Sequence, residues 1–318
     1  MIKIIDNLDK EFLYYKNLLL NSPEITNNFI LSPEYCGSSY LFHDHLLKER
    51  GFFNKSFIIT KNDNPVLIFF CFISGSEKNQ FYDLPSTFLY AENNIDENIE
   101  KILRDKISNL SESKFLYSEE INKNNLDVVS QILLKNKNFS NNCYLSFDQI
   151  MKLELSEEQI LKKIRSSYRR EIKQCTSIIK FYDKKNIEKI IFNKFKNLHH
   201  EVSGKKTRSD DSWQLQYETI ISGEAFLALI QKDNDYGFIF CNFNKNVCNY
   251  FSSVNSNQKN LSMHKGFLET IKLAKKLDIK NFIFGNKIPN IELDSKNENI
   301  SHFKDGFTTN YLPKITFK

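Results

Sequence analysis

The order of the predicted elements constrains the fold most, because the same order occurs in both halves of the chain. Apolar runs around a turn cluster predict a hairpin, followed by a strand, a helix with apolar residues at i, i+3 and i+4, and a short closing strand. In the first half these elements cover 57–73, 87–90, 95–107 and 115–117. In the second half they cover 225–243, 248–254, 263–277 and 281–284, and Gly285 is expected to end the last strand.

This repetition predicts two α/β domains, 1–152 and 153–318, each with a mixed central sheet flanked by helices. The strands on either side of each helix are expected to be parallel, which requires a right-handed crossover. The boundary lies next to Ser156 and Gln159, a predicted capping box that starts a helix. The alternative is one generic α/β domain whose symmetry arose by chance.

Glycine is scarce: there are nine in the whole chain, and no two of them form a G-x-G pair. Rossmann, Walker and kinase-type phosphate loops need clustered glycines, because their backbone approaches phosphates closely. The sequence therefore excludes these three kinds of nucleotide site.

The net charge of +5 is mild, so it demands neither a nucleic acid nor a membrane, although it suits anionic ligands. None of the six cysteines forms a C-x-x-C motif, and we expect them to be small core residues in a reducing compartment. No apolar run approaches the ~18 residues of a membrane span, and no signal peptide is recognisable. These features predict a cytoplasmic protein without a transmembrane segment; its oligomeric state is not predicted.

A basic helix is predicted over 156–178, directly after the boundary. Its apolar stripe is flanked by an arc of basic residues, namely Lys162, Arg165, Arg169, Arg170 and Lys173. One interpretation is a surface for phosphate or nucleic acid, since arginine binds phosphate bidentately. The other is a solvated helix face.

The stretch 198–217 is the richest in polar side chains. His200 or Glu201 is a candidate general base, and Lys205, Lys206 and Arg208 are candidates for holding a phosphate. The site is also expected to include Trp213 and Tyr217. Adjacent histidines on a helix point ~100° apart, so we expect no metal site here. The alternative is a surface loop between two helices, the second capped by Ser209 or Asp210.

A lysine between two phenylalanines stands near the end of the sequence, in Phe303-Lys304-Asp305-Gly306-Phe307. In one interpretation the two rings pack in the core and Lys304 points to solvent. In the other, the rings hold Lys304 at the mouth of a cleft, where its charge meets a phosphate.

The order hairpin, strand, helix, strand resembles the core of GNAT acyltransferases, and two such cores ending in F-K-x-G-F resemble the FemAB-type transferases. The resemblance implies two tandem GNAT-like domains. It also implies transfer of an acyl or aminoacyl group to an amine, on a phosphate-bearing small molecule, a sugar nucleotide, a lipid-linked sugar or a cell-wall precursor. Lys304 would contact a substrate phosphate, and Arg208 and Tyr250 would line the cleft. The remaining substrate-binding residues are expected to be Arg169, Lys206, Trp213, Tyr217, Asn286 and Phe307.

The donor site departs from the GNAT pattern. The segment between the strand and the long helix keeps Gln258, but Leu261 and Met263 stand where GNAT acyltransferases usually have small residues. We expect Gln258 and Ser262 to contact the donor. The resemblance implies no permanently bound cofactor and either acyl-CoA or aminoacyl-tRNA as co-substrate.

In the expected mechanism an amine attacks a thioester or ester carbonyl, and orientation of the two partners is the larger effect. No covalent enzyme intermediate is needed. One alternative is an acetyl-CoA-dependent N-acetyltransferase acting on a small amine or amino sugar. Another, of a different class, is a non-catalytic nucleic-acid-binding protein that uses the basic face 162–173.

Overall fold

A computed structural model describes residues 1–22, 32–74, 87–90, 95–110, 117–120, 128–135, 143–256, 261–289 and 295–317. The chain forms two compact units. Unit 1 comprises Met1–Ile30, His43–Phe147 and Leu312–Lys318, and unit 2 comprises Leu31–Phe42 and Asp148–Tyr311. The boundary predicted at 152/153 separates the two duplicated halves of the sequence rather than these two units, and it stays a prediction.

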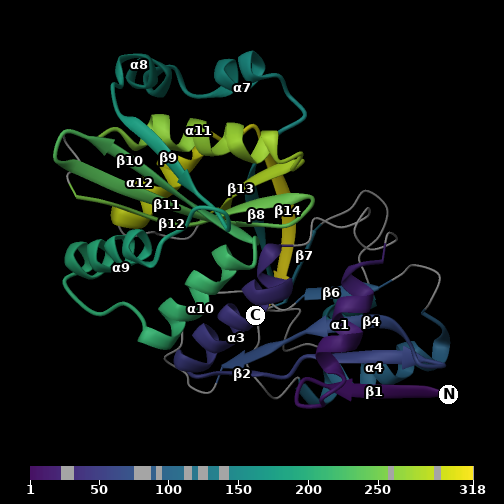
Figure 1. The fold of residues 1–318 in the computed structure, drawn as a ribbon. Coiled ribbons are helices and arrows are strands. Elements are labelled where there is room, and N and C mark those ends of the chain that lie inside the picture. The colour runs from purple at the N-terminus through teal and green to yellow at the C-terminus, as the bar shows by residue number, and fades with distance from the viewer. Residues whose placement is uncertain are drawn as a thin grey trace. The chain divides into compact units, whose positions relative to one another are not determined.

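Unit 1 contains a four-stranded sheet in the order β1-β3-β4-β6 (Figure 1). Its strands are Ile2–Asp6, Phe57–Lys61, Asn64–Phe70 and Thr87–Tyr90, all antiparallel to their neighbours. The other elements of unit 1 are α1 (Phe12–Leu20), β2 (Phe52–Asn54), β5 (Phe72–Ser74), α4 (Glu97–Leu110), β7 (Tyr117–Glu120) and α5 (Val128–Lys135). The predicted hairpin, strand and helix of the first half are thereby confirmed.

One first-half prediction needs correction. The second strand of the hairpin predicted over 57–73 breaks at Cys71, whose N–H donates to the Ser56 hydroxyl and whose carbonyl accepts from the Lys55 N–H. The closing strand is β7, which pairs antiparallel with Lys314–Phe317 of β14 (Asn310–Phe317). Its expected parallel direction relative to β6 stays a prediction. Residues 115 and 116 of that prediction lie outside the described residues.

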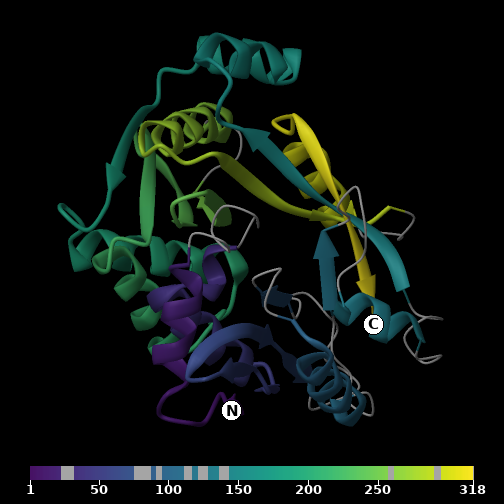
Figure 2. The same cartoon turned by 90° about the vertical axis from the view of Figure 1, so that its right-hand side faces the viewer.

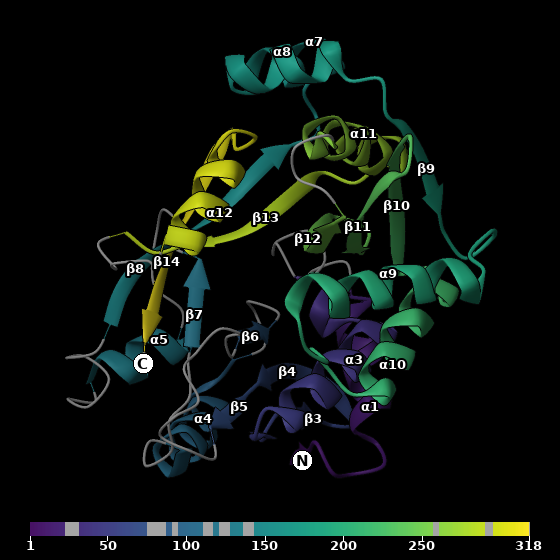
Figure 3. The same ribbon diagram turned by 90° about the vertical axis from the view of Figure 1, so that its left-hand side faces the viewer.

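Unit 2 contains the part of β8 from Asp148 onward and then the strands β13-β12-β11-β10-β9, in that order. Their bounds are Cys143–Lys152, Asn281–Lys287, Val247–Asn255, Asp235–Phe243, Ala225–Lys232 and Ile178–Tyr182. Helix α11 (Met263–Lys276) covers one face, whereas α9 (Lys189–Ser203) and α10 (Asp210–Ile221) cover the other (Figures 1 and 3). The short helix η1 (Pro33–Tyr35) and the start of α3 (Gly37–Glu49) also belong to this unit.

The two faces of this sheet have separate apolar cores. Phe226, Ile239 and Cys241 point to α11, whereas Leu227, Phe238 and Phe240 point to α9 and α10. This alternation follows from the two-residue period of a strand. The predicted hairpin of β10 and β11, the strand β12 and the helix α11 are confirmed, and β12 is parallel to β13 as expected.

The parallel pairing of β12 with β13 is short. It joins Val247–Asn249 to Asn281–Ile283, and beyond these residues the described parts of the two strands do not pair. Close to this point β12 has a bulge against β11, since Tyr250 is opposite Cys241 and Ser252 is opposite Phe240. The extra residue is therefore Phe251.

The single helix predicted over 156–178 is wrong. Two helices, α7 (Glu157–Lys163) and α8 (Ser166–Gln174), are separated by extended backbone at Ile164 and Arg165. There the buried Ile164 packs into the α11-side core, and the Arg165 N–H donates to the Gly306 carbonyl at 2.9 Å. Figures 1 and 2 show α8 lying over α11, with which it packs.

Several smaller predictions can also be compared with the structure. The capping box of Ser156 with Gln159 is confirmed, and so is the cap of α10 by Ser209. Gly285 does not end its strand, because β13 continues through it to Lys287 with the glycine at φ 136°. Among the described residues, no helix has the length and apolar character needed to cross a membrane.

Gly266 on α11 offers a test of the close packing between this helix and the sheet. A Cβ at this position would lie 2.5 Å from Cγ1 of Ile230 on β10. We expect Gly266→Ala to lower the free energy of unfolding by about 1–3 kcal/mol through overpacking, although alanine favours helix by about 1 kcal/mol. Urea unfolding measures this. The exposed Asn193→Ala on α9 is the control and should change stability by less than about 0.5 kcal/mol. A more stable Gly266→Ala protein would contradict the packing argument.

Candidate functional site

Lys304 lies in the last turn of α12 (Ser295–Asp305), between two aromatic anchors. Phe307 is fully buried and packs on Phe267 and Phe284, with ring centroids 5.7 and 5.8 Å away. Phe303 is half-buried and packs on Phe267 at 5.0 Å. The expected anchoring of the lysine by two rings is therefore what the structure has, and Phe307 itself lies in the core.

The Lys304 side chain turns inward rather than to bulk solvent, and it is half-buried. Its Nζ lies 5.6 Å from the centre of the Tyr250 ring, and a Cβ on Gly285 would come within 2.6 Å of it. In the described part of the chain, this ammonium has no hydrogen-bond acceptor and no carboxylate. Burial lowers the pKa of Lys304 to about 8. An ammonium without an acceptor or carboxylate in a poorly solvated place is destabilising.

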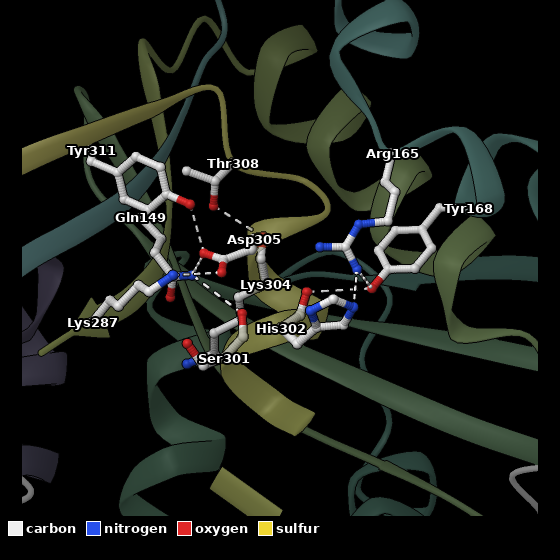
Figure 4. A network of polar contacts seen from close by, with 10 residues as sticks. All are labelled: Gln149, Arg165, Tyr168, Lys287, Ser301, His302, Lys304, Asp305, Thr308 and Tyr311. Carbon is white, nitrogen blue, oxygen red and sulfur yellow. Dashed lines mark hydrogen bonds and ion pairs between the residues drawn. The ribbon is translucent and has the colours of Figure 1, made fainter. Parts of the chain in front are cut away.

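The adjacent Asp305 carboxylate is occupied by other partners (Figure 4). Gln149 Nε2 and Lys287 Nζ donate to it at 2.6 Å, and the Tyr311 hydroxyl donates at 2.7 Å. Burial opposes its ionisation, but these three bonds still hold the pKa of Asp305 below its usual value. Asp305 is thereby kept as a partner of Lys287, and Lys304 is left without a counter-ion.

Gly306 has a packing role in the same motif. A Cβ here would lie 1.9 Å from Cε2 of Tyr168, so only glycine lets α8 approach α12. Arg165 lies over the Tyr168 ring at 5.0 Å and its Nη1 contacts the Tyr168 hydroxyl at 3.0 Å and His302 Nε2 at 2.6 Å (Figure 4). The segment 303–307 is therefore fixed by the packing of α8 and α12.

Tyr250 is the first residue of β12 beyond its pairing with β13. Its ring packs on Phe267 at 5.0 Å, and its hydroxyl shares a hydrogen bond with Ser253 at 2.8 Å. These two residues share a face at a spacing of three because of the bulge at Phe251. Burial raises the pKa of Tyr250 to about 12, so its phenol stays protonated and can only donate or share its proton.

Arg208 lies on the opposite face of the sheet, against α10. Its Nη1 donates to Gln216 Oε1 at 2.7 Å, and its guanidinium lies 4.2 Å from the Trp213 ring and 5.5 Å from the Phe251 ring. Phe251 and Tyr250 point to opposite faces, so the structure does not bring Arg208 to Lys304 as a single cleft. Burial, followed by the charge of Arg208, lowers the pKa of His199 beside it to about 4.

The other predicted residues of this stretch have local partners. His200 Nε2 accepts a hydrogen bond from Trp213 Nε1 at 3.1 Å, so this nitrogen is not available to take a proton from a substrate. Glu201 is exposed. Lys206 pairs with Asp210 at 2.8 Å, and Tyr217 lies under Lys189 at 4.2 Å.

Three further predicted residues lie apart from this stretch. Arg169 donates to the Lys162 carbonyl at 2.8 Å, which places it on the α7–α8 surface. Asn286 is exposed on β13, next to Gly285. Figure 3 shows α12, which carries Lys304, well separated from α9, which carries His200. The predicted residues therefore divide into a Lys304 group with Tyr250 and an Arg208 group with Trp213 and His200.

The predicted donor residues lie at the start of α11. Gln258 is outside the described residues. Ser262 is the N-cap residue of α11, but its side chain accepts no bond from the first turn. Its hydroxyl is 3.4 Å from His264 Nδ1, which also pairs with Glu171 at 2.8 Å. The Glu171 carboxylate thus lies beside the positive end of this helix.

The residues that hold Asp305 were not anticipated from the sequence. Gln149 is 156 positions away from Asp305, and no local pattern links them. Gly285 was noted only as a terminator, although its missing side chain makes room for Lys304. Among the described residues, no group of three or more His, Cys, Asp or Glu side chains is placed to hold a metal ion.

Solved structures with a similar fold exist despite very low sequence identity. One described as FemX has a TM-score of 0.59 at 10% identity, with 96% of this chain and 95% of that chain covered. A tandem GNAT protein from the clavulanic acid biosynthesis pathway has a TM-score of 0.53 at 8% identity, with 100% and 98% covered. The C-terminal domain of a putative lysylphosphatidylglycerol synthetase from Agrobacterium fabrum has 0.53 at 8%, with 96% and 92% covered.

No family model matches the sequence, and no curated protein is similar to it. The structural likeness shows the fold alone, because the identities are 8–10%. The chain has the fold of FemX-like and tandem GNAT proteins, and the predicted fold class of two GNAT-like α/β domains is confirmed.

The hydrogen bond between His200 and Trp213 can be tested by stability. His200→Ala would leave the buried indole N–H without an acceptor, so we expect the free energy of unfolding to fall by about 1–3 kcal/mol. Urea unfolding followed by the fluorescence of Trp213, the only tryptophan, measures the change. Its exposed neighbour serves as the control, because Glu201→Ala should cost less than about 0.5 kcal/mol. Equal losses of unfolding free energy in the two variants would show that the His200–Trp213 hydrogen bond does not stabilise the fold.

Proposed function

We propose that this chain is an acyltransferase that moves an acyl or aminoacyl group from a thioester or ester to an amine. The observation that carries the proposal is the unpartnered Lys304 ammonium, beside Gly285 and Tyr250, where β12 and β13 stop pairing. Fold neighbours described as FemX and as a tandem GNAT protein support the reaction class.

In this proposal Lys304 binds an anionic group of a co-substrate, and a phosphate fits its chemistry best. The ammonium is a compact point charge, and the low local polarity strengthens its attraction to an anion. The Asp305 carboxylate does not compete, because Lys287, Tyr311 and Gln149 already hold it.

The end of the parallel pairing supplies a place for the reacting carbonyl. Beyond Asn249, the backbone of β12 has no partner strand on the β13 side within the described residues. Backbone N–H groups of such an unpaired strand can donate to a carbonyl oxygen as negative charge develops on it. The bond to the amine nitrogen then forms as the bond to sulfur or oxygen breaks, and orientation of the two partners supplies much of the rate.

The acceptor is proposed to be an amine on a phosphate-bearing small molecule or a lipid-linked sugar. The Arg208 guanidinium, which lies over the Trp213 and Phe251 rings, has the planar donor geometry that suits a phosphate or carboxylate. Arg208 lies on the α9–α10 face. Acceptor and donor would therefore approach the place where β12 and β13 stop pairing from opposite faces of the sheet. The lysylphosphatidylglycerol synthetase among the fold neighbours supports an acceptor of this phosphate-bearing kind.

The donor is proposed to be aminoacyl-tRNA, with acyl-CoA as the second choice. A CoA pyrophosphate at the start of α11 would meet the Glu171 carboxylate, which lies beside His264. The two negative charges, pyrophosphate and carboxylate, would repel each other at such a short separation. Isothermal titration with acetyl-CoA distinguishes the two donors, because tight binding would reverse this order.

Hydroxamate formation tests the reaction class. The protein is mixed with dilute hydroxylamine and either acetyl-CoA or a mixed pool of aminoacylated tRNA, and a blank without protein corrects for the spontaneous reaction. Faster hydroxamate formation with one donor supports acyl transfer. No acceleration with either donor would overturn the proposed function.

Lys304→Met should separate activity from stability. We expect turnover to fall by about 100-fold or more, which matches the loss of one strong electrostatic contact. At pH 7 the free energy of unfolding should rise by about 1–3 kcal/mol, because a buried unpaired charge is removed. Since the folded-state pKa of about 8 is below the ordinary 10.5, this gain is full below pH 8 and shrinks as the pH approaches 10.5. Retained turnover would exclude the anion-binding role.

The pH dependence of kcat/KM gives a second test of Lys304. Because the pKa of Lys304 is about 8, the cation is lost as the pH rises through that value, and kcat/KM should fall above it. Lys304→Arg keeps a charge at every accessible pH, so the fall near pH 8 should disappear even if the rate is lower. Identical pH profiles of the two proteins would assign the fall to another group.

A further inference from the structure

A second polar cluster lies where β12 leaves β13, on the opposite face of the sheet from Lys304. Asn249 is the last β12 residue paired with β13. Its Nδ2 donates to the two carboxylate oxygens of Glu34 at 2.7 and 2.8 Å, and to the Ser32 hydroxyl at 2.8 Å. Glu34 belongs to η1, which packs on β11 and β12.

The neighbouring strand adds a second amide to this cluster. Asn242 on β11 is directly opposite Asn249, and directly opposed residues of an antiparallel pair share a face. Phe238 and Phe240 lie in the core under α9 and α10, and Asn242 continues their alternation. Both amides are therefore on the α9–α10 face, the face that carries Arg208.

The cluster holds hydrogen-bond acceptors that have no donor. Asn249 Oδ1 and Asn242 Oδ1 are both buried without a hydrogen-bond partner. The orientation of the Asn249 amide follows from chemistry, because the reversed amide would set its oxygen against the Glu34 carboxylate. A buried acceptor without a donor is destabilising, so such oxygens point to an N–H group supplied from outside the chain.

Glu34 is buried, with 7% of its surface exposed, and its surroundings are poorly solvated. Burial raises the pKa of the adjacent Tyr35 well above its usual value, and the negative charges of Glu34 and Asp148 raise it further. A carboxylate and two amide oxygens together accept hydrogen bonds from a primary amine or its ammonium form, whereas they repel a phosphate.

We propose that Glu34 is the proton acceptor of the transfer reaction and that Asn249 and Asn242 position the acceptor amine. The inference rests on the proposed function. The bound ammonium first gives a proton to a Glu34 oxygen and becomes the neutral amine. The amine nitrogen then forms a bond to the carbonyl carbon, the carbon–sulfur or carbon–oxygen bond of the donor breaks, and the second nitrogen proton leaves with the thiolate or alkoxide. Glu34 releases its proton to water.

Glu34 meets the requirements of a base better than the residues predicted from the sequence. The Nε2 of His200 is occupied by the Trp213 N–H, and Glu201 is exposed. Both Glu34 oxygens also accept from Asn249, but a carboxylate has further lone pairs, and this bond holds Glu34 at the residue where the strands begin to diverge. Lys304 on one face and Glu34 on the other would then act on the two partners of one reaction.

Glu34→Gln tests the base. The rates with methylamine and with hydroxylamine as acceptor are compared, using the donor with which the wild-type protein is active. At pH 7 methylamine is a cation that must lose a proton, whereas hydroxylamine is largely neutral. The variant should lose about 100-fold or more of its rate with methylamine and less than about tenfold with hydroxylamine. The glutamine oxygen can still accept one of the two contacts from Asn249 Nδ2, and the side chain keeps its size.

Glu224→Gln is the matched control. The Glu224 carboxylate accepts from the Ser39 N–H at 3.0 Å, so it also fastens the segment 32–42 to this sheet. It should leave both rates within about threefold. Parallel losses with the two amines in Glu34→Gln, or no loss with either, would overturn the role of Glu34.

Asn242→Ala gives a test that does not disturb Glu34. It removes an acceptor that has no partner in the free protein, and we expect the KM for methylamine to rise about tenfold with kcat little changed, as for one lost hydrogen bond. An unchanged KM would overturn the placement of the amine. So would a wild-type protein that uses hydroxylamine but not methylamine, whereas no reaction with either amine would overturn the proposed function itself.

Discussion

The short parallel contact between β12 and β13 is the constraint on which the rest of the candidate site depends. Three residue pairs join the strands, and then the pairing stops. If the ladder continued, backbone bonds would fill the space beside Tyr250, and Gly285 would have no reason to lack a side chain. Because the ladder ends there, α12 can bring Lys304 to one face of the gap in pairing, and η1 can bring Glu34 to the other.

A cation without a counter-ion is stable in such a place only if its neighbours cannot neutralise it. Asp305 follows Lys304 directly, yet three donors from β8, β13 and β14 hold it away. The Lys304 charge and the unpaired amide oxygens of Asn242 and Asn249 thus each destabilise the folded protein. Natural proteins commonly retain such locally destabilising features where a ligand compensates for them.

Much of the fold could be predicted from the sequence because apolar periodicity reports local structure. The element order and the capping box at Ser156 are local, and the structure has them. The break at Ile164 could not be predicted, because it depends on a bond from Arg165 to Gly306, far along the chain. The candidate site was predicted in part: Lys304 stood out by its flanking rings, whereas Gln149 and Glu34 reach their partners across more than 150 residues.

The two faces of the unit 2 sheet give a physical reason why the predicted residues did not form one group. A strand directs successive side chains to opposite faces. Tyr250 and Phe251 are adjacent aromatic residues, but Tyr250 lies on the α11 face and Phe251 on the α9–α10 face. An acyl transfer needs two partners that approach one carbon from different directions. In the proposed reaction, a sheet whose pairing with β13 stops at Asn249 would let charged groups on its two faces act on different partners without neutralising each other. The division of Lys304 from Arg208 would then follow from the geometry of that reaction.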